Sequence, residues 1–267
     1  MHKPLALVTG GSAGIGLEIA RLLAQNGHDL IITGTSERVM QASATLIQEG
    51  ANVIPVQSDL ATETGNQAVL DAIAADGRTV TVAVINAGIA IGGAFKDIPL
   101  ERHLHLIGLN VLSPVRLVYA LIPPMIAAGG GKFLFVSSLS ATTPTPYESV
   151  YGPSKAFLTS FGNSIREELV GTGIQITNLH PGATATEFHA RAGMGSTRFG
   201  DNSWKNDPTL VARQGFDAMM RGDTNVVGGD EATQAVWQLH KEMSEEDKAR
   251  RHAAQARPGT AADFTKP

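Results

Sequence analysis

Tyr151 and Lys155 are the side chains of this sequence whose types and spacing could do chemistry together. They lie four residues apart in YGPSK, at the start of a segment with helical periodicity, so both should project from one face of a helix. A neighbouring ammonium favours the phenolate, which moves the tyrosine pKa from about 10 toward the pH at which a general acid works best. The pair predicts proton transfer at a substrate, although a Tyr-x-x-x-Lys pair alone also occurs on ordinary helix surfaces.

Ser138 strengthens the catalytic interpretation of that pair. It lies thirteen residues before Tyr151, directly after the apolar segment KFLFVS at 132–137. An apolar run of this kind is typical of a buried parallel strand, and open parallel sheets bind their ligands beyond the carboxyl ends of the strands. A hydroxyl at that position belongs to the edge where a substrate would lie.

The elements that must hold these residues follow from the alternation of two patterns along the chain. Short apolar runs alternate with segments of helical periodicity, which predicts a doubly wound, Rossmann-type α/β fold with a mostly parallel seven-stranded sheet and helices on both faces. Strands are expected at 5–9, 29–34, 52–57, 80–85, 132–137, 173–179 and 224–227. Helices are expected after 13, at 36–50, 63–76, 100–127 with interruptions at Ser113-Pro114 and Pro123-Pro124, 149–170, 207–221 and 232–256.

We expect one domain over residues 1–229. Residues 230–267 are expected to form a charged helical tail whose last ten or so residues, in RPGTAADFTKP, are disordered. No repeat or linker divides the chain.

The stretch Leu5–Gly16, LALVTGGSAGIG, couples the first strand to a glycine turn and the first helix. Glycine accepts positive φ and, lacking Cβ, lets a phosphate approach the N–H groups at a helix N-terminus, where an anion is also favoured by the helix dipole. A dinucleotide pyrophosphate would fit there. The spacing Gly-x-x-x-Gly-x-Gly differs from the common Gly-x-Gly-x-x-Gly fingerprint, so an ordinary turn is the alternative from this stretch alone.

Polar or glycine residues follow six of the predicted strands at the point where each strand ends. Each could be a helix cap or turn residue, but the carboxyl ends of parallel strands meet at one edge of a sheet. Together they predict one ligand site along that edge. The residues are Gly10, Thr35 with Ser36, Asp59, Asn86 to Gly88, Ser138, and Pro181 with Gly182.

Composition excludes several other classes of protein. The chain has 267 residues, 43% of them hydrophobic, which suits one large domain. A net charge of −4 without a basic stripe argues against nucleic acid or a membrane surface as partner. With no cysteine there is no disulfide, thiolate metal site or cysteine nucleophile. Because the first strand begins at once, without room for a signal peptide, we expect a cytoplasmic protein.

Taken together, the sequence resembles the short-chain dehydrogenase/reductases. The resemblance rests on TGGSAGIG at 9–16, INAG at 85–88, Asn110, Ser138 with YGPSK at 151–155, and PGATAT at 181–186, in the right order over about residues 5–190. It implies that Tyr151 donates or accepts the substrate proton, that Ser138 hydrogen-bonds the carbonyl or hydroxyl, and that Lys155 holds the nicotinamide ribose and depresses the Tyr151 pKa. Asn110 would hold a water in the proton relay.

The predicted dinucleotide site combines the glycine turn, the strand ends and this resemblance. The resemblance places Asp59 and Leu60 beside adenine, Asn86 to Gly88 along the ribose, and Thr184 and Thr186 at the carboxamide and phosphates. The whole predicted set is Gly10, Ser12, Gly14, Ile15, Gly16, Thr35, Ser36, Arg38, Asp59, Leu60, Asn86, Ala87, Gly88, Tyr151, Lys155, Pro181, Gly182, Thr184 and Thr186.

The end of the second strand favours NADP(H) over NAD(H). NAD sites usually offer an Asp or Glu there to the adenosine 2′-OH. Here the strand is followed by Thr35 and Ser36, and Glu37 is expected in the first turn of the next helix with Ser36 as its N-cap. A 2′-phosphate would meet these hydroxyls, with Arg38 within reach. Because Ala13 gives the glycine turn no further cation, NAD(H) remains an alternative cofactor.

The predicted activity is hydride transfer between a nicotinamide and a carbonyl or secondary alcohol of a small to medium, largely apolar substrate. The resemblance makes residues 1–229 a dinucleotide-binding catalytic domain with a substrate loop at about 183–207. It implies a mostly apolar lining without an obvious charged anchor, formed by Phe95, Leu139, Tyr147, Phe188, Met194 and Trp204. Two alternatives remain: a catalytically silent nucleotide sensor or scaffold, and an epimerase or dehydratase that uses a transient ketone.

Two further expectations concern histidines and association. His103, His105 and His180 lack metal-ligand spacing with other ligands, so we interpret them as packed or surface residues. The helices at 100–127 and 149–170 carry apolar faces that in this family usually form a four-helix interface, so a homodimer or homotetramer is expected.

Overall fold

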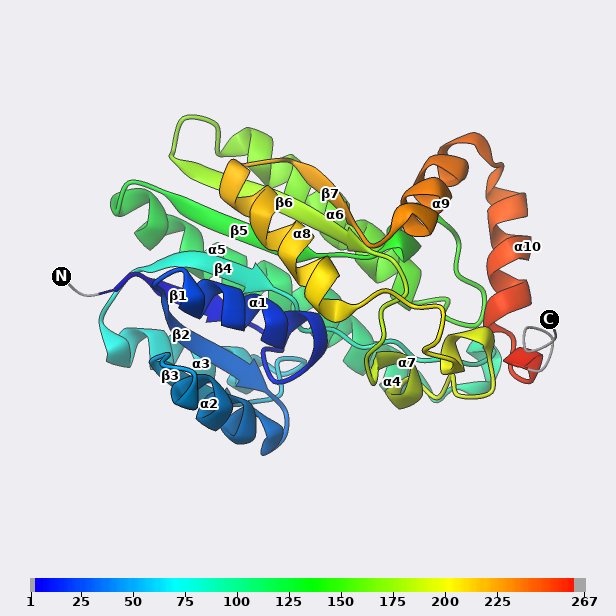
Figure 1. Cartoon of the computed structure of the whole chain (residues 1–267), viewed down its shortest axis with the longest axis horizontal. Helices are drawn as coiled ribbons and strands as arrows, with labels where there is room; N and C mark the ends of the chain where they lie inside the picture. Colours follow the sequence, from blue (N-terminus) through cyan, green and yellow to red (C-terminus); the bar gives the residue numbers. More distant parts are fainter. Residues whose placement is uncertain (1–2, 262–267) are drawn as a thin grey trace.

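Residues 3–261, the part of the chain that this computed structural model describes, are built around a seven-stranded sheet with helices on both faces (Figure 1). The strand order is β3-β2-β1-β4-β5-β6-β7, and all neighbouring strands are parallel. The strands are β1 (Leu5–Val8), β2 (Asp29–Gly34), β3 (Val53–Gln57), β4 (Val80–Ile85), β5 (Gly131–Val136), β6 (Ile174–Pro181) and β7 (Asn225–Gly228). The predicted doubly wound fold is confirmed.

A helical layer covers each face of the sheet and encloses an apolar core of its own. All four residues of β1, LALV, are buried, because both faces of a doubly wound sheet are covered. One layer comprises α1 (Gly14–Gln25), α2 (Arg38–Gln48) and α8 (Pro208–Arg221). The other comprises α3 (Glu63–Asp76), α5 (Ser113–Ala127) and α6 (Tyr151–Glu168).

The order of the strands reverses between β1 and β4. The chain proceeds outward from β1 to β3 and then returns to β4 on the other side of β1. The loops that leave β1 and β4 therefore run to opposite sides, which opens a crevice at their carboxyl ends. The glycine turn after β1 and the segment Asn86–Gly88 after β4 both lie at this crevice.

The stretch from Leu100 to Ala127 is one continuous helical rod with a change of winding in its middle. It consists of α4 (Leu100–Ile107), the π-helical turn η2 (Gly108–Leu112) and α5. The prediction that the helix is interrupted at the prolines was wrong. Pro114 lies in the first turn of α5, where no N–H is needed, and the helix continues through Pro123 and Pro124 to its end. The irregularity falls instead at the π-helical turn that contains Asn110.

Within the described residues, this rod is also the one helical stretch long and apolar enough to cross a bilayer. Half of its apolar window is buried inside the protein. Leu117, Leu121 and Met125 of α5 belong to the core beneath the sheet. The fold therefore accounts for the apolar character of the stretch by packing it on the sheet.

The expected C-terminal tail is two helices rather than one. α9 (Glu231–Glu242) ends before Met243, and α10 (Glu245–Ala256) begins after Ser244, whose side chain accepts a hydrogen bond from the N–H of Asp247. Figure 1 shows the two helices together at the end of the molecule opposite the N-terminus. Of the segment expected to be disordered, Gly259 and Ala261 donate backbone hydrogen bonds to Ser196, and residues 262–267 lie outside the described part.

Four short elements complete the same end of the molecule. They are η1 (Phe95–Asp97), η3 (Leu139–Thr142), α7 (Phe188–Arg191) and η4 (Arg198–Gly200). Because η3 follows β5 and α7 follows β6, both begin at the carboxyl edge of the sheet.

Candidate active site

The glycine turn after β1 has the geometry of a phosphate cradle. Gly10 and Gly14 have φ angles of +65° and +54°, which L side chains rarely adopt. A Cβ on Gly16 would collide with the carbonyl oxygen of Gly10 and the amide of Asn86. Only glycine allows the turn to pass this close to the loop after β4.

The N-terminus of α1 is left open toward the crevice. Ala13 occupies the N-cap without a side-chain hydrogen bond, and the first turn holds no acidic residue. Ser12, Ala13, Gly14 and Ile15 line the cavity there. Free N–H groups at the positive end of a helix dipole suit a diphosphate, so this cradle fits a dinucleotide.

Thr9 and Asn86 bind the ends of β1 and β4 to each other. The Asn86 amide donates to the carbonyl oxygens of Thr9 and Gly10 at 2.9 and 3.1 Å. The Thr9 hydroxyl accepts the N–H groups of Asn86 and Ala87 at 2.9 and 3.0 Å. These bonds hold the two sides of the crevice at a constant separation.

A single cavity of about 940 Å³ runs along this edge of the sheet. Most of the predicted site residues line it: Gly10, Ser12, Gly14, Ile15, Thr35, Leu60, Asn86, Ala87, Gly88, Ser138, Tyr151, Lys155, Pro181, Gly182, Thr184 and Thr186. The cavity lining does not include Gly16, Ser36, Arg38, Asp59 or Asn110. Gly16 and Asn110 lie one layer behind it, against Asn86 and Gly88.

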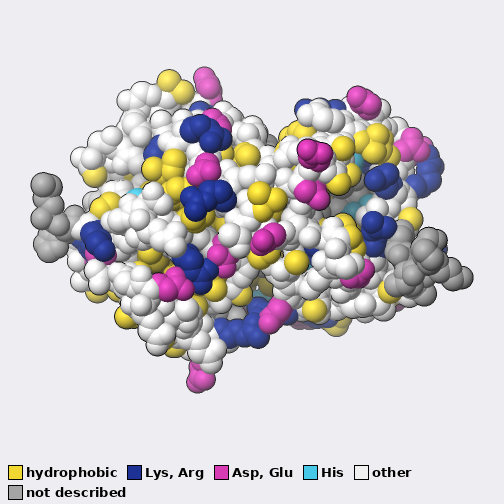
Figure 2. Space-filling view, in the orientation of Figure 1, with side chains coloured by type: hydrophobic (Ala, Val, Ile, Leu, Met, Phe, Trp, Pro, Cys, Tyr) yellow, Lys and Arg dark blue, Asp and Glu magenta, His cyan; other side chains and the backbone are white. Residues whose placement is uncertain are grey.

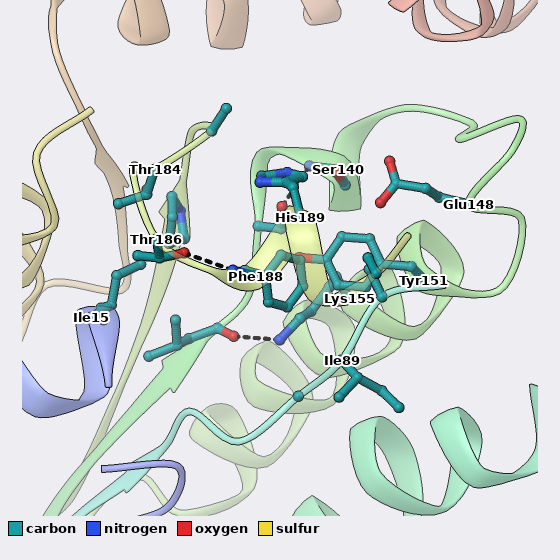
Figure 3. Close-up of a pocket in the computed structure, with 18 of the residues that line it drawn as sticks. Ile15, Ile89, Ser140, Glu148, Tyr151, Lys155, Thr184, Thr186, Phe188 and His189 are labelled. Atoms are coloured by element: carbon teal, nitrogen blue, oxygen red, sulfur yellow. Dashed lines mark hydrogen bonds between the residues drawn. The ribbon is translucent and has the colours of Figure 1, made fainter. Parts of the chain in front are cut away.

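The two predicted threonines after β6 have different surroundings. Thr184 is buried and donates its hydroxyl proton to the carbonyl oxygen of Gly182 at 2.9 Å. Thr186 lies against the glycine turn, where its methyl carbon would be 3.0 Å from a Cβ on Gly14. Its hydroxyl accepts the N–H of Phe188 at 3.3 Å (Figure 3).

The groups expected at the adenine end are mostly exposed. Asp59 accepts the N–H of Ala61 at 2.9 Å, and the side chain of Leu60 is buried in the cavity wall. Thr35 and Ser36 are exposed after β2. Ser36 is not the N-cap of α2; that position is taken by Glu37, which makes no capping bond with its side chain. The Ser36 hydroxyl is therefore not used in capping.

Arg38 is held by an acidic residue from across the crevice. Its guanidinium donates to both carboxylate oxygens of Glu187, at 2.5 and 3.2 Å, and Glu187 also accepts a bond from Arg191 at 2.6 Å. The ion pair raises the pKa of Arg38 and lowers the pKa of Glu187. A 2′-phosphate would have to compete with this carboxylate for Arg38.

Tyr151 is the first residue of α6 and is enclosed by apolar neighbours. Pro153 lies in the first turn of the same helix, as expected. The phenol ring packs against Phe188 with the ring centroids 5.5 Å apart (Figure 3). Lys155, one turn further, donates from Nζ to the carbonyl oxygen of Val136 at 2.8 Å and lies 6.0 Å from the centroid of the Tyr151 ring.

Burial dominates the protonation of both groups. It raises the pKa of Tyr151 above its ordinary value, a hydrogen bond with Ser138 opposes this, and the carboxylate of Glu148 raises it further. Burial lowers the pKa of Lys155 to about 8. The predicted lowering of the Tyr151 pKa by Lys155 is therefore not seen: burial dominates, and the lysine Nζ is bonded to the carbonyl oxygen of Val136.

Ser138 and Asn110 are fixed by the backbone around them. The Ser138 hydroxyl oxygen accepts the N–H of Ser140 at 3.0 Å, which leaves its own proton for the phenol or a substrate. The Asn110 amide donates to Ile89 O and Ser154 Oγ, at 2.9 and 3.0 Å, and accepts the Ile89 N–H at 3.0 Å. One lone pair of Asn110 Oδ1 remains for the predicted water. The π-helical turn at residues 108–112 gives Asn110 this position.

Sequence reasoning missed one wall of the cavity, which α9 and α10 supply. The cavity-facing residues recur at helical spacing, and this periodicity was the available signal. They are Thr233, Val236 and His240 of α9, and Lys248, Arg251, His252 and Gln255 of α10. His252 Nε2 lies 3.1 Å from Oε2 of the buried Glu148, three residues before Tyr151.

The expected apolar lining needs correction. Leu139, Phe188 and Trp204 line the cavity, whereas Phe95, Tyr147 and Met194 are not part of its lining. Phe95 is exposed and stacks on His103, and Met194 is packed in a small core. Charged side chains of α10 also line the cavity, so the lining does offer a charged anchor.

Of the three histidines considered in the sequence, His103 and His180 are buried and His105 is exposed. His180 has Nδ1 3.4 Å from the carbonyl oxygen of Ser138 and packs on Trp237. His103 is buried and His105 is 3.9 Å from a carboxylate oxygen of Asp59. Among residues 3–261, no three His, Cys, Asp or Glu side chains are grouped as a metal site.

An uncapped glycine turn at the topological switch point, beside a Ser–Tyr–Lys group on the same edge, defines a nucleotide-dependent dehydrogenase. The model of the family described as short chain dehydrogenase matches residues 4–195. The chain belongs to this family, as the resemblance predicted, and its members are oxidoreductases.

Three similar proteins illustrate the relationship. The sulfoacetaldehyde reductase 2 of Chromohalobacter salexigens is 32% identical over 69% of this chain and 74% of its own. An NADP-dependent 3-hydroxy acid dehydrogenase of Salmonella typhi is 28% identical over 87% of each chain. A short-chain dehydrogenase from Sphingobium yanoikuyae, solved in complex with NADPH, superposes with a TM-score of 0.79 at 27% identity, covering 90% of this chain and 96% of its own.

Proposed function

We propose that this chain is an NADP(H)-dependent carbonyl reductase or alcohol dehydrogenase. The observation that carries the proposal is the burial of Tyr151, Ser138 and Lys155 in one cavity that continues to the open N-terminus of α1. The relatives named a sulfoacetaldehyde reductase and a 3-hydroxy acid dehydrogenase support carbonyl–alcohol chemistry. NADP(H) is the cofactor, in agreement with the NADPH-bound neighbour and the absence of an acid after β2.

The residues of the chain have distinct roles in this proposal. The first turn of α1 and Thr186 hold the diphosphate, and Thr35, Ser36 and Arg38 hold the 2′-phosphate. When bound there, the nicotinamide would supply or accept the hydride at its C4 atom.

The proton is handled by the side chains of the active site. The Tyr151 hydroxyl, protonated at neutral pH, gives its proton to the carbonyl oxygen as charge develops there, and Ser138 donates a second hydrogen bond to the same oxygen. Lys155 places a positive charge beside the phenolate that remains. Asn110 keeps the loop after β4 in place beneath them.

The test is a panel of ketones and aldehydes followed by NADPH consumption at 340 nm. Stoichiometric NADPH consumption is expected, which neither a silent nucleotide sensor nor an epimerase would produce. Tyr151→Phe should lower kcat by about 10²- to 10⁴-fold, since that is the usual contribution of a general acid, while NADPH binding persists. Undiminished turnover in this variant would refute the assignment of Tyr151.

A further inference from the structure

One face of α10 places a group of basic side chains in the wall of the active-site cavity. Lys248, Arg251, His252 and Gln255 recur at spacings of three, one and three residues, so they share one face of the helix. All four line the cavity that contains Tyr151. Figure 2 shows histidine side chains at the bottom of a hollow at the α9–α10 end of the molecule, with Lys and Arg side chains at its edge.

The opposite face of the same helix carries the balancing acids. Arg250 lies on that side, where it is exposed and pairs with Asp247 at 2.8 Å and Glu246 at 3.9 Å. Glu246 and Asp247 therefore face away from the cavity, whereas Glu245, one turn before Lys248, bonds to that ammonium at 2.6 Å.

The basic groups on the cavity side lie close to one another. Burial is the largest cause that lowers the pKa of His240 on the adjacent face of α9. The charges of Lys248, Arg251 and His252 lower it further, and Glu245 opposes them. Lys248 is only 9% exposed, and its partner Glu245 has a side chain that is 71% exposed. Within residues 3–261, Arg251 forms no ion pair.

None of the acids that line the cavity pairs with Lys248 or Arg251. Glu148 bonds to His252 at 3.1 Å, Glu187 bonds to Arg38 and Arg191, and Asp230 caps the N-terminus of α9. Glu101 is exposed at the start of α4. Lys248 is bonded to Glu245 at 2.6 Å, whereas Arg251 is exposed and has no acidic partner among residues 3–261. An oxyanion in the cavity would supply a partner for Arg251 and a second one for Lys248.

We propose that Lys248 and Arg251 bind an anionic oxygen group of the substrate, so that the carbonyl substrates of this enzyme carry a carboxylate or a similar oxyanion. The inference rests on the proposed function and names the substrate class of the same site. A guanidinium suits the two oxygens of a carboxylate, and an ammonium adds a compact point charge. The bond between His252 and Glu148 joins this face of α10 to the segment that leads into Tyr151, and Lys248, Arg251 and Tyr151 line the same cavity.

Paired substrates test the proposal in turnover. With NADPH and the whole chain, kcat/KM for acetoacetate should exceed that for methyl acetoacetate, which has the same ketone without the charge. Lys248→Gln and Arg251→Gln should each lower this ratio about 10-fold, the effect of losing a hydrogen bond to a charged group. The matched control is Arg250→Gln on the outer face of the same helix, which should keep the ratio of the wild type. An equal ratio in all four proteins would overturn the proposal.

A binding measurement separates this proposal from the proposed function. Trp204 lines the cavity and Trp237 lies on α9, so their fluorescence can report a ligand without turnover. Butanoate should quench it at lower concentration than butanamide, and Arg251→Gln, which alters an exposed residue and spares the fold, should remove the difference. If no ketone is reduced but butanoate is preferred, the proposed function fails and the anion site stands. If butanamide binds as well as butanoate, the anion site is refuted.

Discussion

At the scale of single residues, burial determines how Tyr151 and Lys155 are protonated. Spacing alone indicated an ammonium that stabilises a phenolate. In the folded chain the two groups share a poorly solvated cavity, and desolvation raises the pKa of Tyr151 and lowers the pKa of Lys155. A raised Tyr151 pKa keeps the proton that carbonyl reduction consumes, whereas a lowered Lys155 pKa makes the nearby positive charge dependent on pH.

The Lys155 pKa predicts the alkaline limit of activity. Because burial lowers that pKa to about 8, the ammonium is present below pH 8 and is lost as the pH rises through this value. The kcat/KM for NADPH, which reports groups of the free enzyme, should therefore fall above about pH 8. Lys155→Arg keeps its charge over the whole range, so its profile should lose this fall even if its maximum is lower. A fall at the same pH in the variant would assign it to another group.

Arg38 and Glu187 predict a pair of opposite effects on cofactor choice. Arg38→Gln should raise KM for NADPH relative to NADH by about 10-fold, because a charge-assisted bond to the 2′-phosphate is lost. Glu187→Gln should lower KM for NADPH, because it releases Arg38 from the bonds it makes across the crevice. Steady-state kinetics with both cofactors measure the ratio, and a ratio unchanged in Arg38→Gln would exclude contact with the 2′-phosphate.

At the scale of elements, the C-terminal helices differ most from their expected role. Charge composition predicted a charged helical tail after residue 230, set apart from the catalytic domain. Charge composition does not indicate which face of a helix packs against the rest of the protein. In α10 the buried side holds Lys248, His252 and Ala256, which pack against the active-site end of the molecule.

The contact between α10 and the catalytic segment predicts a large effect on stability. Glu148 and His252 are 3% and 8% exposed, so His252→Ala leaves a buried carboxylate without its partner. The free energy of unfolding should fall by about 3 kcal/mol, measured by urea denaturation.

The double variant Glu148→Gln/His252→Ala is the control, because it removes the buried charge as well. It should recover much of that loss. An equally unstable double variant would mean that packing of the His252 ring, rather than the carboxylate, supports the contact.

At the scale of the whole molecule, the helical layer of α3, α5 and α6 leaves apolar side chains uncovered. Tyr119 is 81% exposed on α5, with Leu112 at 47% on the preceding turn, and Phe157 of α6 is 37% exposed. Solvated apolar faces of this kind are typical of contacts between subunits. They support the predicted homodimer or homotetramer.

Light scattering after size exclusion checks this association. The wild type should have a mass of two or four times 28.0 kDa, and Tyr119→Glu should shift it toward one chain, because a charge at a subunit contact is costly to desolvate. Leu210→Glu on α8, an exposed apolar residue of the other layer, should leave the mass unchanged. A wild type of one chain would contradict the prediction.

The sequence by itself determined the sheet, the order of its elements and most of the crevice. Strand periodicity, the glycine turn and the polar residues at strand ends are local features, and parallel strands bring their carboxyl ends together whatever the details of packing. For this reason Gly10, Asn86, Ser138, Tyr151 and Pro181 could be predicted to lie at one edge.

Only the tertiary structure decided what surrounds that edge. The partner of Arg38, the bond between Glu148 and His252 and the cavity-facing side of α10 join residues about a hundred or more positions apart, and no periodicity encodes such contacts. The same holds for the pKa of Tyr151, because desolvation depends on every neighbour that excludes water. The chemistry was therefore visible in the chain, whereas the charge of the substrate site was not.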